Sequence, residues 1–485
     1  MGKVRTAASL VKRFGLRRTM FYYAHGRRER AIPFSCFSLN LIEKDRMWKL
    51  AKDHPISFAH VGEEGEYWML LPAGARISTE FIAACTIALN QVKKRPKVIY
   101  TDVAISPEVS GDEAFWKISL PNVGEVSACF FPEYSLETAE CLDFFGGVIC
   151  VASAWAKEMG LSDDVEIRNF LRQQAFDEGE VLHIPRILSV QKHPVEFHRQ
   201  TLVETKSDTP LVSIVIPNKD QRDTLKTCID SILEKTAYPN YEIVVIENNS
   251  EESETFAYYE SLQEPVRVVT CETDWNFSYI NNFGVKHTKG SLLLFLNNDT
   301  QVLDANWLSE MVAYVQRSGV GAVGAKLCYP DGTIQHGGVT VGVRGVAGHA
   351  YINWPKEAKG YLHRLEFPQN VSAVTAACMM VPRDVFYQVG GFDESLKVAF
   401  NDTDLCMKIR DAGYRIVCLP QVVLTHFESK SRGHDDQNPQ KLARFNRESM
   451  TFQRRWFHEI INGDPTYNVH LSYEDDNFEV KNLWT

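Results

Sequence analysis

Short clusters of acidic, amide and imidazole side chains are the parts of this sequence that could do chemistry. Asn297-Asn298-Asp299 follows an apolar stretch, and its carboxylate is a type of ligand that divalent cations prefer. Asn401-Asp402-Thr403-Asp404 precedes a helical pattern, and an Asp at a helix start that projects into a cleft can act as a general base. His426 follows another apolar stretch, and a neutral imidazole there could complete a metal site. Taken singly, each cluster also fits a structural role as a turn, a helix cap or a surface loop.

Phosphates could be held either by a Gly-rich loop or by a bound divalent metal. Lys430 and Arg432 follow His426 and could pair with phosphate oxygens. The Gly-rich patterns GxGxxG and GxxxxGK[ST] are both absent after the first strand expected in this region, which disfavours a dinucleotide fold or a P-loop. A carboxylate-bound divalent metal is the usual substitute, because it neutralises phosphate charge without a helix-end cradle.

Alternating strands and helices are expected to position these clusters from about residue 211 onward. Continuous apolar runs predict strands covered on both faces, at 211–216, 242–246, 266–270, 291–296 and 421–425. Helical patterns lie between the first four, at 222–233, 253–262 and 278–287. Ligands of such α/β sheets bind beyond the carboxyl ends of the strands, where this chain places its polar residues.

Length and composition predict a multidomain globular protein. The chain has 485 residues, of which 44% are hydrophobic and 24% charged, and this suits two or three domains. We predict a basic amphipathic segment at 1–31, a smaller α/β domain at 32–206, a main α/β domain at 207–434 and a helical tail at 435–485.

Charge and cysteine content restrict the partners and the location. The net charge of −10 argues against nucleic-acid binding, yet residues 1–31 hold nine Lys or Arg and one acid, Glu29. A basic amphipathic helix can lie on an anionic membrane, so a peripheral membrane contact is one hypothesis for this segment and a solvated tail is the other. Eleven cysteines without a CxxC pair, and no apolar run near 20 residues, predict a cytoplasmic protein without a membrane span.

Taken together, the clusters resemble the family 2 glycosyltransferases over roughly residues 212–433. The matching segments lie in the family's order along the chain. They are Val212-Ser213-Ile214-Val215-Ile216-Pro217, Val244-Val245-Ile246-Glu247-Asn248-Asn249-Ser250, Asn276-Phe277-Ser278 with Asn281-Asn282-Phe283-Gly284, Leu296-Asn297-Asn298-Asp299, and Gly390-Gly391-Phe392-Asp393 with Asn401-Asp402-Thr403-Asp404-Leu405-Cys406. The resemblance implies the GT-A fold, an α/β fold with a mixed, mostly parallel sheet.

The resemblance also implies roles for individual residues. Asp402 occupies the position of the family's catalytic base. Asn297 stands where the metal motif usually begins with Asp, so Asp299 would supply the main carboxylate and, with His426, hold Mg²⁺ or Mn²⁺. Residues that would contact the nucleotide sugar are Pro217, Glu247, Asn249, Asn282, Asn297, Lys430 and Arg432.

Further segments resemble bacterial O-antigen and rhamnan-type glycosyltransferases. These are Gln335-His336-Gly337-Gly338, the stretch from His426 to Gly433, and Asp464-Pro465-Thr466-Tyr467-Asn468-Val469. The implied activity is inverting transfer of a sugar from a nucleoside-diphosphate sugar to a hydroxyl of a growing, lipid-linked cell-surface glycan. The alternatives are an inactive glycan-binding or scaffolding relative and, from another enzyme class, a nucleotidyltransferase.

The domain at 32–206 resembles a degenerate, shortened GT-A unit. Tyr100-Thr101-Asp102, Phe145-Gly146-Gly147-Val148 and the stretch from His183 to Leu188 match segments of tandem enzymes of this kind. The unit lacks an evident opening strand, and Val103-Ala104 replaces the acidic end of the family's turn. We therefore expect this domain to be inactive and to serve as a scaffold or acceptor platform.

Overall fold

The computed structural model describes most of the chain. The described residues are 56–57, 67–72, 75–78, 81–106, 116–120, 124–177, 179–192, 195–197, 209–427 and 439–481. The basic segment 1–31 and the residues Lys430 and Arg432 lie outside them.

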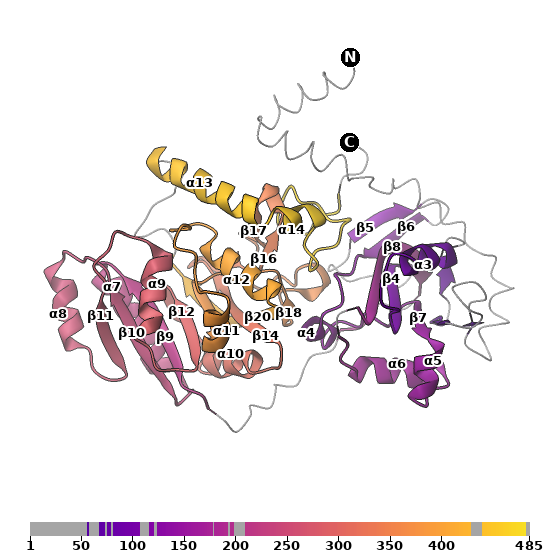
Figure 1. Ribbon diagram of the computed structural model, residues 1–485, viewed down its shortest axis with the longest axis horizontal. Helices are drawn as coiled ribbons and strands as arrows, with labels where there is room; N and C mark the ends of the chain where they lie inside the picture. Colours follow the sequence, from indigo (N-terminus) through magenta and orange to yellow (C-terminus); the bar gives the residue numbers. More distant parts are fainter. Residues whose placement is uncertain are drawn as a thin grey trace, which may run out of the picture. The chain divides into compact units, whose positions relative to one another are not determined.

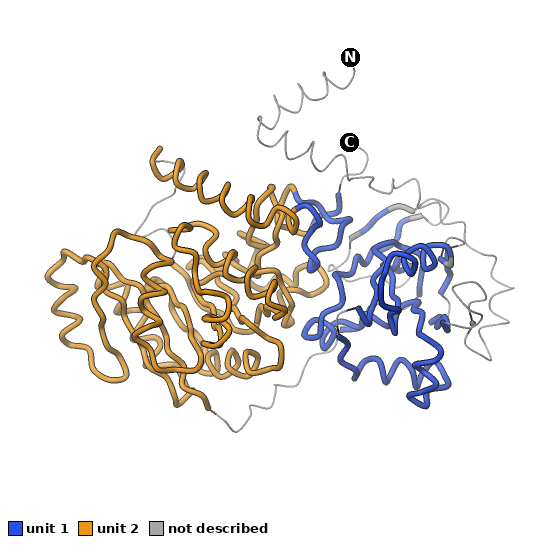
Figure 2. Tube along the Cα trace, in the orientation of Figure 1, with its two compact units in different colours: residues 1–198, 461–473, 479–485 blue, residues 199–460, 474–478 orange. Residues whose placement is uncertain are grey.

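The described residues divide into two compact units, which Figure 2 colours separately. Unit 1 takes in those within 1–198, 461–473 and 479–485, and unit 2 those within 199–460 and 474–478. The segment predicted as a tail is therefore shared: its long helix belongs to unit 2, and residues 461–473 belong to unit 1.

Unit 2 is built on a mixed ten-stranded sheet with the main order β11-β10-β9-β12-β19-β14-β20-β13 (Figure 1). Strands β9 to β12, β14 and β20 run in one direction, and β13, β15, β18 and β19 run in the other. The strands are β9 Val212–Asn218, β10 Tyr241–Glu247, β11 Val266–Thr270, β12 Leu292–Leu296, β13 Thr300–Val302, β14 Val320–Cys328, β15 Ile334–His336, β18 Gln369–Asn370, β19 Cys378–Pro382 and β20 Arg415–His426. A separate two-stranded sheet pairs β16 Val339–Val341 with β17 Ala347–His349.

Helices cover both faces of this sheet, as the continuous apolar strands predict. Alternate residues of β9 enter two cores: Ile214 packs in the cluster that contains α7 and α10, and Val215 in the cluster that contains α9, α11 and α12. The helices of unit 2 begin with α7 Arg222–Lys235, α8 Ser253–Ser261, α9 Phe277–Lys286, α10 Trp307–Val315, α11 Arg383–Gln388, α12 Asn401–Asp411 and α13 Pro439–Arg455. After α13 comes α14 Phe457–Asn462, and two short 3₁₀ turns lie at Val343–Gly345 and Tyr361–His363.

Unit 1 contains an eight-stranded sheet with the path β1-β2-β7-β4-β6-β5, and β8 pairs with β3 and β4. Its strands are β1 Ile56–Ser57, β2 Tyr67–Leu70, β3 Arg76–Ile77, β4 Val98–Ile105, β5 Trp116–Leu120, β6 Gly124–Cys129, β7 Ile149–Ala152 and β8 Val181–Gln191. Its described helices are α3 Phe81–Leu89, α4 Leu136–Ala139, α5 Ser153–Glu158 and α6 Asp164–Gln173.

Four strand pairings of unit 1 repeat four pairings of unit 2. The antiparallel pairs β2–β7, β4–β7 and β3–β8 correspond to β12–β19, β14–β19 and β13–β20. The parallel pair β4–β8 corresponds to β14–β20. Beyond β12 the sheet of unit 2 continues with the parallel strand β9, whereas the described neighbour of β2 is the antiparallel, two-residue β1.

Several predicted boundaries change in the structure. His426 is the last residue of β20 rather than part of a following loop. Helix α12 starts at Asn401, so Asp402 lies inside its first turn. The ten cysteines of the described part of the chain are buried free thiols, as their scattered spacing predicts. No helix among the described residues is long and apolar enough to cross a membrane.

Candidate functional site

A buried carboxylate–imidazole pair lies where β12 and β20 end. Asp299 Oδ1 is 3.0 Å from His426 Nε2, and only 8% of Asp299 is exposed. The other ring nitrogen of His426, Nδ1, is 2.8 Å from Gln335 Oε1, and Asn297 Nδ2 is 3.2 Å from Nε2. Since an amide oxygen only accepts, Gln335 Oε1 is placed to accept a hydrogen bond from Nδ1, while Nε2 faces the Asp299 carboxylate and the Asn297 amide. Asp299 is thus buried, and not on an exposed loop as its sequence context predicts.

Asp402 lies at the start of α12, where its carboxylate faces the segment before β19. Phe400 precedes the helix with a left-handed φ of 61°, and this sharp reversal places Asp402 in the first turn. Asp402 Oδ2 accepts a hydrogen bond from the Ala376 amide at 3.2 Å, and Oδ1 accepts one from the Thr403 amide at 2.7 Å. Asp402 as a residue is half-buried rather than fully enclosed.

The same short segment connects Asp402 with the carboxylate–imidazole pair. Ala376 donates its amide to Asp402, and the carbonyl of the next residue, Ala377, accepts the amide of Asn297 at 3.1 Å. Asn297 in turn contacts His426. The first two clusters and His426, which lie far apart in the sequence, are therefore brought together, as the sequence predicts.

Polar side chains at three neighbouring strand ends form one network. Asn298 donates to Asn218 at 2.6 Å, Asn218 donates to the Tyr259 hydroxyl at 2.7 Å, and that hydroxyl donates to Glu247 at 3.0 Å. Glu247 also accepts the amide and hydroxyl of Ser250. The Glu247 carboxylate therefore shapes the turn after β10 through internal hydrogen bonds.

Three further residues were predicted to contact the nucleotide. Pro217 and Asn249 lie near the same end of the sheet, and Asn282 lies on α9. Pro217 is buried in β9 opposite Ile246 of β10, and Asn249 holds the next turn with a left-handed φ of 55°. Asn282 on α9 instead makes its contacts with another loop: its amide donates to the Phe392 carbonyl at 2.9 Å and accepts the Phe392 amide at 3.0 Å.

Two histidines beside the site, His336 and His349, were not among the residues for which the sequence predicted a chemical role. His336 Nδ1 is 2.8 Å from His349 Nδ1, and the Thr375 amide lies 3.4 Å from His336 Nε2. Burial, together with the neighbouring His349 and His426, lowers the pKa of His336 well below its usual range. The neutral ring thus supports the segment that carries Ala376. Gln335 likewise belongs to a segment that resembles O-antigen enzymes, but no spacing rule pairs it with His426.

The donor set of the buried pair suits a divalent cation that arrives with a phosphate ligand. Among the described residues, no group of three or more His, Cys, Asp or Glu side chains is placed to hold a metal ion. Asp299 supplies one carboxylate, a ligand type that suits Mg²⁺ and Mn²⁺, and His426 adds one imidazole. Mg²⁺ is usually bound through one or two carboxylates plus substrate phosphates, so these two side chains are a sufficient protein contribution.

Comparisons with known proteins find a matching family and several similar sequences. Residues 213–390 match the family described as glycosyl transferase family 2. An uncharacterised protein of Sinorhizobium fredii is 46% identical over 63% of this chain and 34% of its own length. The O-antigen biosynthesis protein RfbC of Myxococcus xanthus is 42% identical over 54% and 20%, respectively. An N-acetylglucosaminyl-diphospho-decaprenol L-rhamnosyltransferase of Mycobacterium tuberculosis is 30% identical over 24% and 40%.

Two solved structures are also similar. GalNAc-T7, solved with UDP, GalNAc and Mn²⁺, gives a TM-score of 0.43 at 18% identity over 56% of this chain and 53% of that chain. The mannosyltransferase PcManGT of Pyrobaculum calidifontis, solved with GDP-Man and Mn²⁺, gives 0.39 at 16% identity over 55% and 72%.

Sheet order and family match together define an α/β domain of the nucleotide-diphospho-sugar transferase class, with the GT-A fold. The predicted resemblance to the family 2 glycosyltransferases is confirmed for residues 213–390, and so is the similarity to O-antigen and rhamnosyltransferase proteins. The chain spans about a third of the length of the Sinorhizobium relative and a fifth of RfbC.

Proposed function

We propose that this protein transfers a sugar from a nucleoside-diphosphate sugar to a hydroxyl group of a growing cell-surface glycan. The observation that carries the proposal is the position of Ala376 and Ala377. These adjacent residues contact Asp402 on one side and Asn297, the neighbour of the carboxylate–imidazole pair, on the other. A proposed base and a proposed metal-binding pair therefore flank one short segment. A reaction between an acceptor hydroxyl and a diphosphate-linked sugar needs both.

Asp402 is the proposed general base. Its carboxylate accepts two backbone amides, the residue is half-buried rather than fully enclosed, and in this role it would take the proton of an acceptor hydroxyl. The deprotonated oxygen would attack the anomeric carbon from the face opposite the leaving diphosphate. The new glycosidic bond forms as the bond to the phosphate oxygen breaks, and this single displacement inverts the configuration.

Asp299 and His426 are the proposed ligands of Mg²⁺ or Mn²⁺. A divalent cation bound there would offset the negative charge that develops on the leaving diphosphate. Asn297 and Gln335 contact the two ring nitrogens of His426, so the imidazole is oriented before the donor arrives. Pro217, Glu247, Asn249 and Asn282 form or support the proposed nucleotide pocket, to which Lys430 and Arg432 would add phosphate contacts.

The acceptor is proposed to be a lipid-linked glycan such as an O-antigen precursor. The similarity to RfbC and to a rhamnosyltransferase named for a diphospho-decaprenol acceptor supports this substrate class. Such an acceptor lies at a membrane, and the basic segment 1–31 has the charge to tether the protein there. Deleting residues 1–30 is expected to release the protein from sedimenting anionic vesicles; unchanged sedimentation would contradict the tether.

A donor screen tests the proposal directly. The purified full chain is incubated with UDP-, GDP- and dTDP-sugars and a glycan acceptor, and release of nucleoside diphosphate is measured with and without chelator. We expect one donor to release its nucleoside diphosphate in a metal-dependent manner, with inverted configuration in the product. Pyrophosphate release would indicate a nucleotidyltransferase, and no turnover with any donor would indicate the inactive, glycan-binding alternative.

A further inference from the structure

Helix α13 presents one face to the loop that leads into Asp402. Glu448 on this face is almost fully buried, and its two carboxylate oxygens accept the amides of Lys397 at 3.2 Å and Ala399 at 2.7 Å. One turn further along, Phe452 stacks on Phe400 with ring centroids 5.4 Å apart and an interplanar angle of 28°. Phe400 is the residue with left-handed backbone that immediately precedes α12. The helix therefore holds the entry to α12 at two successive turns.

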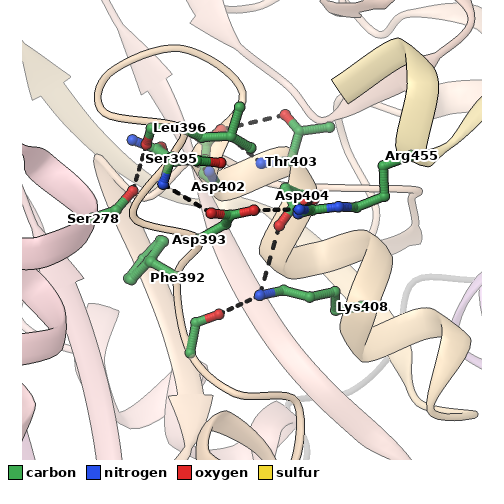
Figure 3. Close-up of polar contacts among 12 residues, drawn as sticks. Ser278, Phe392, Asp393, Ser395, Leu396, Asp402, Thr403, Asp404, Lys408 and Arg455 are labelled. Atoms are coloured by element: carbon green, nitrogen blue, oxygen red, sulfur yellow. Dashed lines mark hydrogen bonds and ion pairs between the residues drawn. The ribbon is translucent and has the colours of Figure 1, made fainter. Parts of the chain in front are cut away.

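Arg455, the last residue of α13, bridges two carboxylates on either side of Asp402 in the sequence. Its Nη1 donates to Asp404 Oδ1 at 2.7 Å, and its Nη2 donates to Asp393 Oδ2 (Figure 3). Trp456 adds a hydrogen bond from its indole nitrogen to the same oxygen of Asp404, at 2.9 Å. A planar guanidinium suits this double contact because its donors form a fixed fork.

Asp404 depends on this arrangement because no part of it is exposed. Its second oxygen, Oδ2, has no hydrogen-bond partner among the described residues and lies 3.6 Å from Lys408 Nζ, which also donates to the Gly391 carbonyl. A buried carboxylate needs a close cation, and removing one partner of a buried pair leaves an uncompensated charge. Without Arg455, Asp404 would keep only the indole donor and a longer ion pair, so the first turn of α12 would rearrange.

We propose that Arg455 is a positioning residue for Asp402, an inference that rests on the proposed function. Arg455 acts through Asp404 and Asp393, which fix the first turn of α12 and the turn before it. Asp402, between them in sequence, is thereby kept against the Ala376 amide. The family match ends at residue 390, so this contribution comes from outside the matched segment.

The test compares Arg455→Ala with Arg455→Lys and with Arg454→Ala, whose exposed side chain is the neighbour on the same helix. Kinetics are measured on the full chain with the donor that the nucleoside-diphosphate screen identifies. We expect Arg455→Ala to lower kcat about 10- to 100-fold, because a small misplacement of a reacting group costs this much. The donor KM should stay unchanged, since the proposed nucleotide pocket lies at β9, β10 and β12. A single ammonium cannot reproduce the fork, so Arg455→Lys should restore only part of kcat.

A double variant shows whether the effect passes through Asp404. Asp404→Asn combined with Arg455→Ala should lower kcat about as much as either change alone, because both break the same connection. An unchanged kcat in Arg455→Ala would overturn the proposal. A loss that follows the folded fraction in thermal melting, with kcat per folded molecule unchanged, would overturn it as well.

The experiment also separates this inference from the proposed function. If the wild-type protein turns over a donor and Asp402→Asn does not, while Arg455→Ala is normal, only the positioning role is wrong. If the wild-type protein turns over no donor, the proposed function fails and the positioning role fails with it.

Discussion

Helix α6 of unit 1 and helix α12 of unit 2 contact the segment before the neighbouring strand in the same pattern. In unit 2, Cys406 contacts the Val374 carbonyl and Arg410 the Ser372 hydroxyl. These two partners lie four and six residues before Cys378, the first residue of β19.

In unit 1, the corresponding contacts run from Arg168 to the Phe145 carbonyl and from Arg172 to the Asp143 carboxylate. Phe145 and Asp143 lie four and six residues before Ile149, the first residue of β7. This common spacing matches Arg168 with Cys406 and Arg172 with Arg410. It follows that Asp164 of unit 1 is the counterpart of Asp402, a correspondence that sequence alone left open.

The matched acids differ in their surroundings. Asp402 meets a backbone amide, whereas Asp164 forms an ion pair with Arg168 at 2.9 Å, and Arg168 fills the place of the small Cys406. The Asp164 carboxylate is thus held by a guanidinium, which competes with a hydroxyl for the same oxygen. The comparison supports the proposal that the base position of unit 1 has no catalytic role.

The metal position differs as well. Residues 71–75, between β2 and β3, contain no acid where unit 2 has Asp299, and Val190 pairs with Arg76 of β3 as His426 pairs with Thr300 of β13. The strand pairing is thus common to both units, but the side chains with proposed chemistry are confined to unit 2. Pairing depends on many interchangeable apolar residues, while a base or a metal ligand depends on one side chain.

The matched acids give the largest expected difference. Asp402→Asn should lower kcat by about 10²–10⁴-fold, the usual contribution of a general base, while the fold is retained. Asp164→Asn should leave kcat unchanged. Steady-state kinetics of the two purified variants test this, and a larger effect in Asp164→Asn would reverse our assignment of the units.

Loss of the metal carboxylate should be nearly as severe. Asp299→Asn is expected to lower activity by about 100-fold or more, since metal stabilisation of a transition state is worth several kcal/mol. Asp304→Asn, an exposed acid five residues further on, is the matched control and should behave as wild type. Titration with Mn²⁺ should show weaker metal binding, seen as a higher Mn²⁺ concentration for half-maximal activity, only in the Asp299 variant; equal titrations would remove Asp299 from the metal site.

A buried histidine distinguishes the units in their response to pH. His183 of unit 1 lies 3.0 Å from Asp102 and 3.2 Å from Glu133. Burial opposes its charged form, but Asp102 and Glu133 outweigh burial and raise the pKa of His183 to about 9. Because the folded pKa exceeds the unfolded value of about 6.5, the stabilisation is complete below pH 6.5 and is lost as pH rises through 9.

The expected size of this effect is about 3 kcal/mol. Urea unfolding of the full chain at pH 6 and pH 10 measures it, with His470 and Asp102 as the other titratable groups that influence this site. His183→Gln should reduce the difference between the two pH values. If the wild type and this variant respond alike, His183 is not charged in the folded protein.

The smallest expected difference is in the stability cost of losing Asp143 or Ser372, the two matched partners that lie six residues before β7 and β19. Asp143→Ala should cost about 1–3 kcal/mol, because it removes a buried carboxylate from Arg172, and Ser372→Ala about 0.5–1.5 kcal/mol. Denaturant unfolding compares the two variants. If Ser372→Ala lowers the free energy of unfolding more than Asp143→Ala does, the two contacts do not play matching roles.

The sequence predicted well those features that depend on local pattern. The bounds of β11 agree with prediction, since Val266–Thr270 is an apolar run between breaks. The approach of Asp299 and His426 followed from the family resemblance, and the structure brings them together. The contact between Asp402 and Ala376 could not be predicted, because it depends on pairing of segments 26 residues apart. The start of α12 was also missed, since no propensity rule places Phe400 in a left-handed conformation.

The split of the C-terminal region between the units has a consequence for folding order. Asn468, in the part that belongs to unit 1, donates to both carboxylate oxygens of Asp102, at 3.0 and 3.2 Å. During synthesis, domains generally fold from the N-terminus onward. Unit 1 cannot follow this order, because the residue that completes its buried Asp102–His183 cluster emerges from the ribosome only after all of α7 to α14. Until then, the two hydrogen bonds from Asn468 to Asp102 are missing, and the cluster stays incompletely hydrogen-bonded.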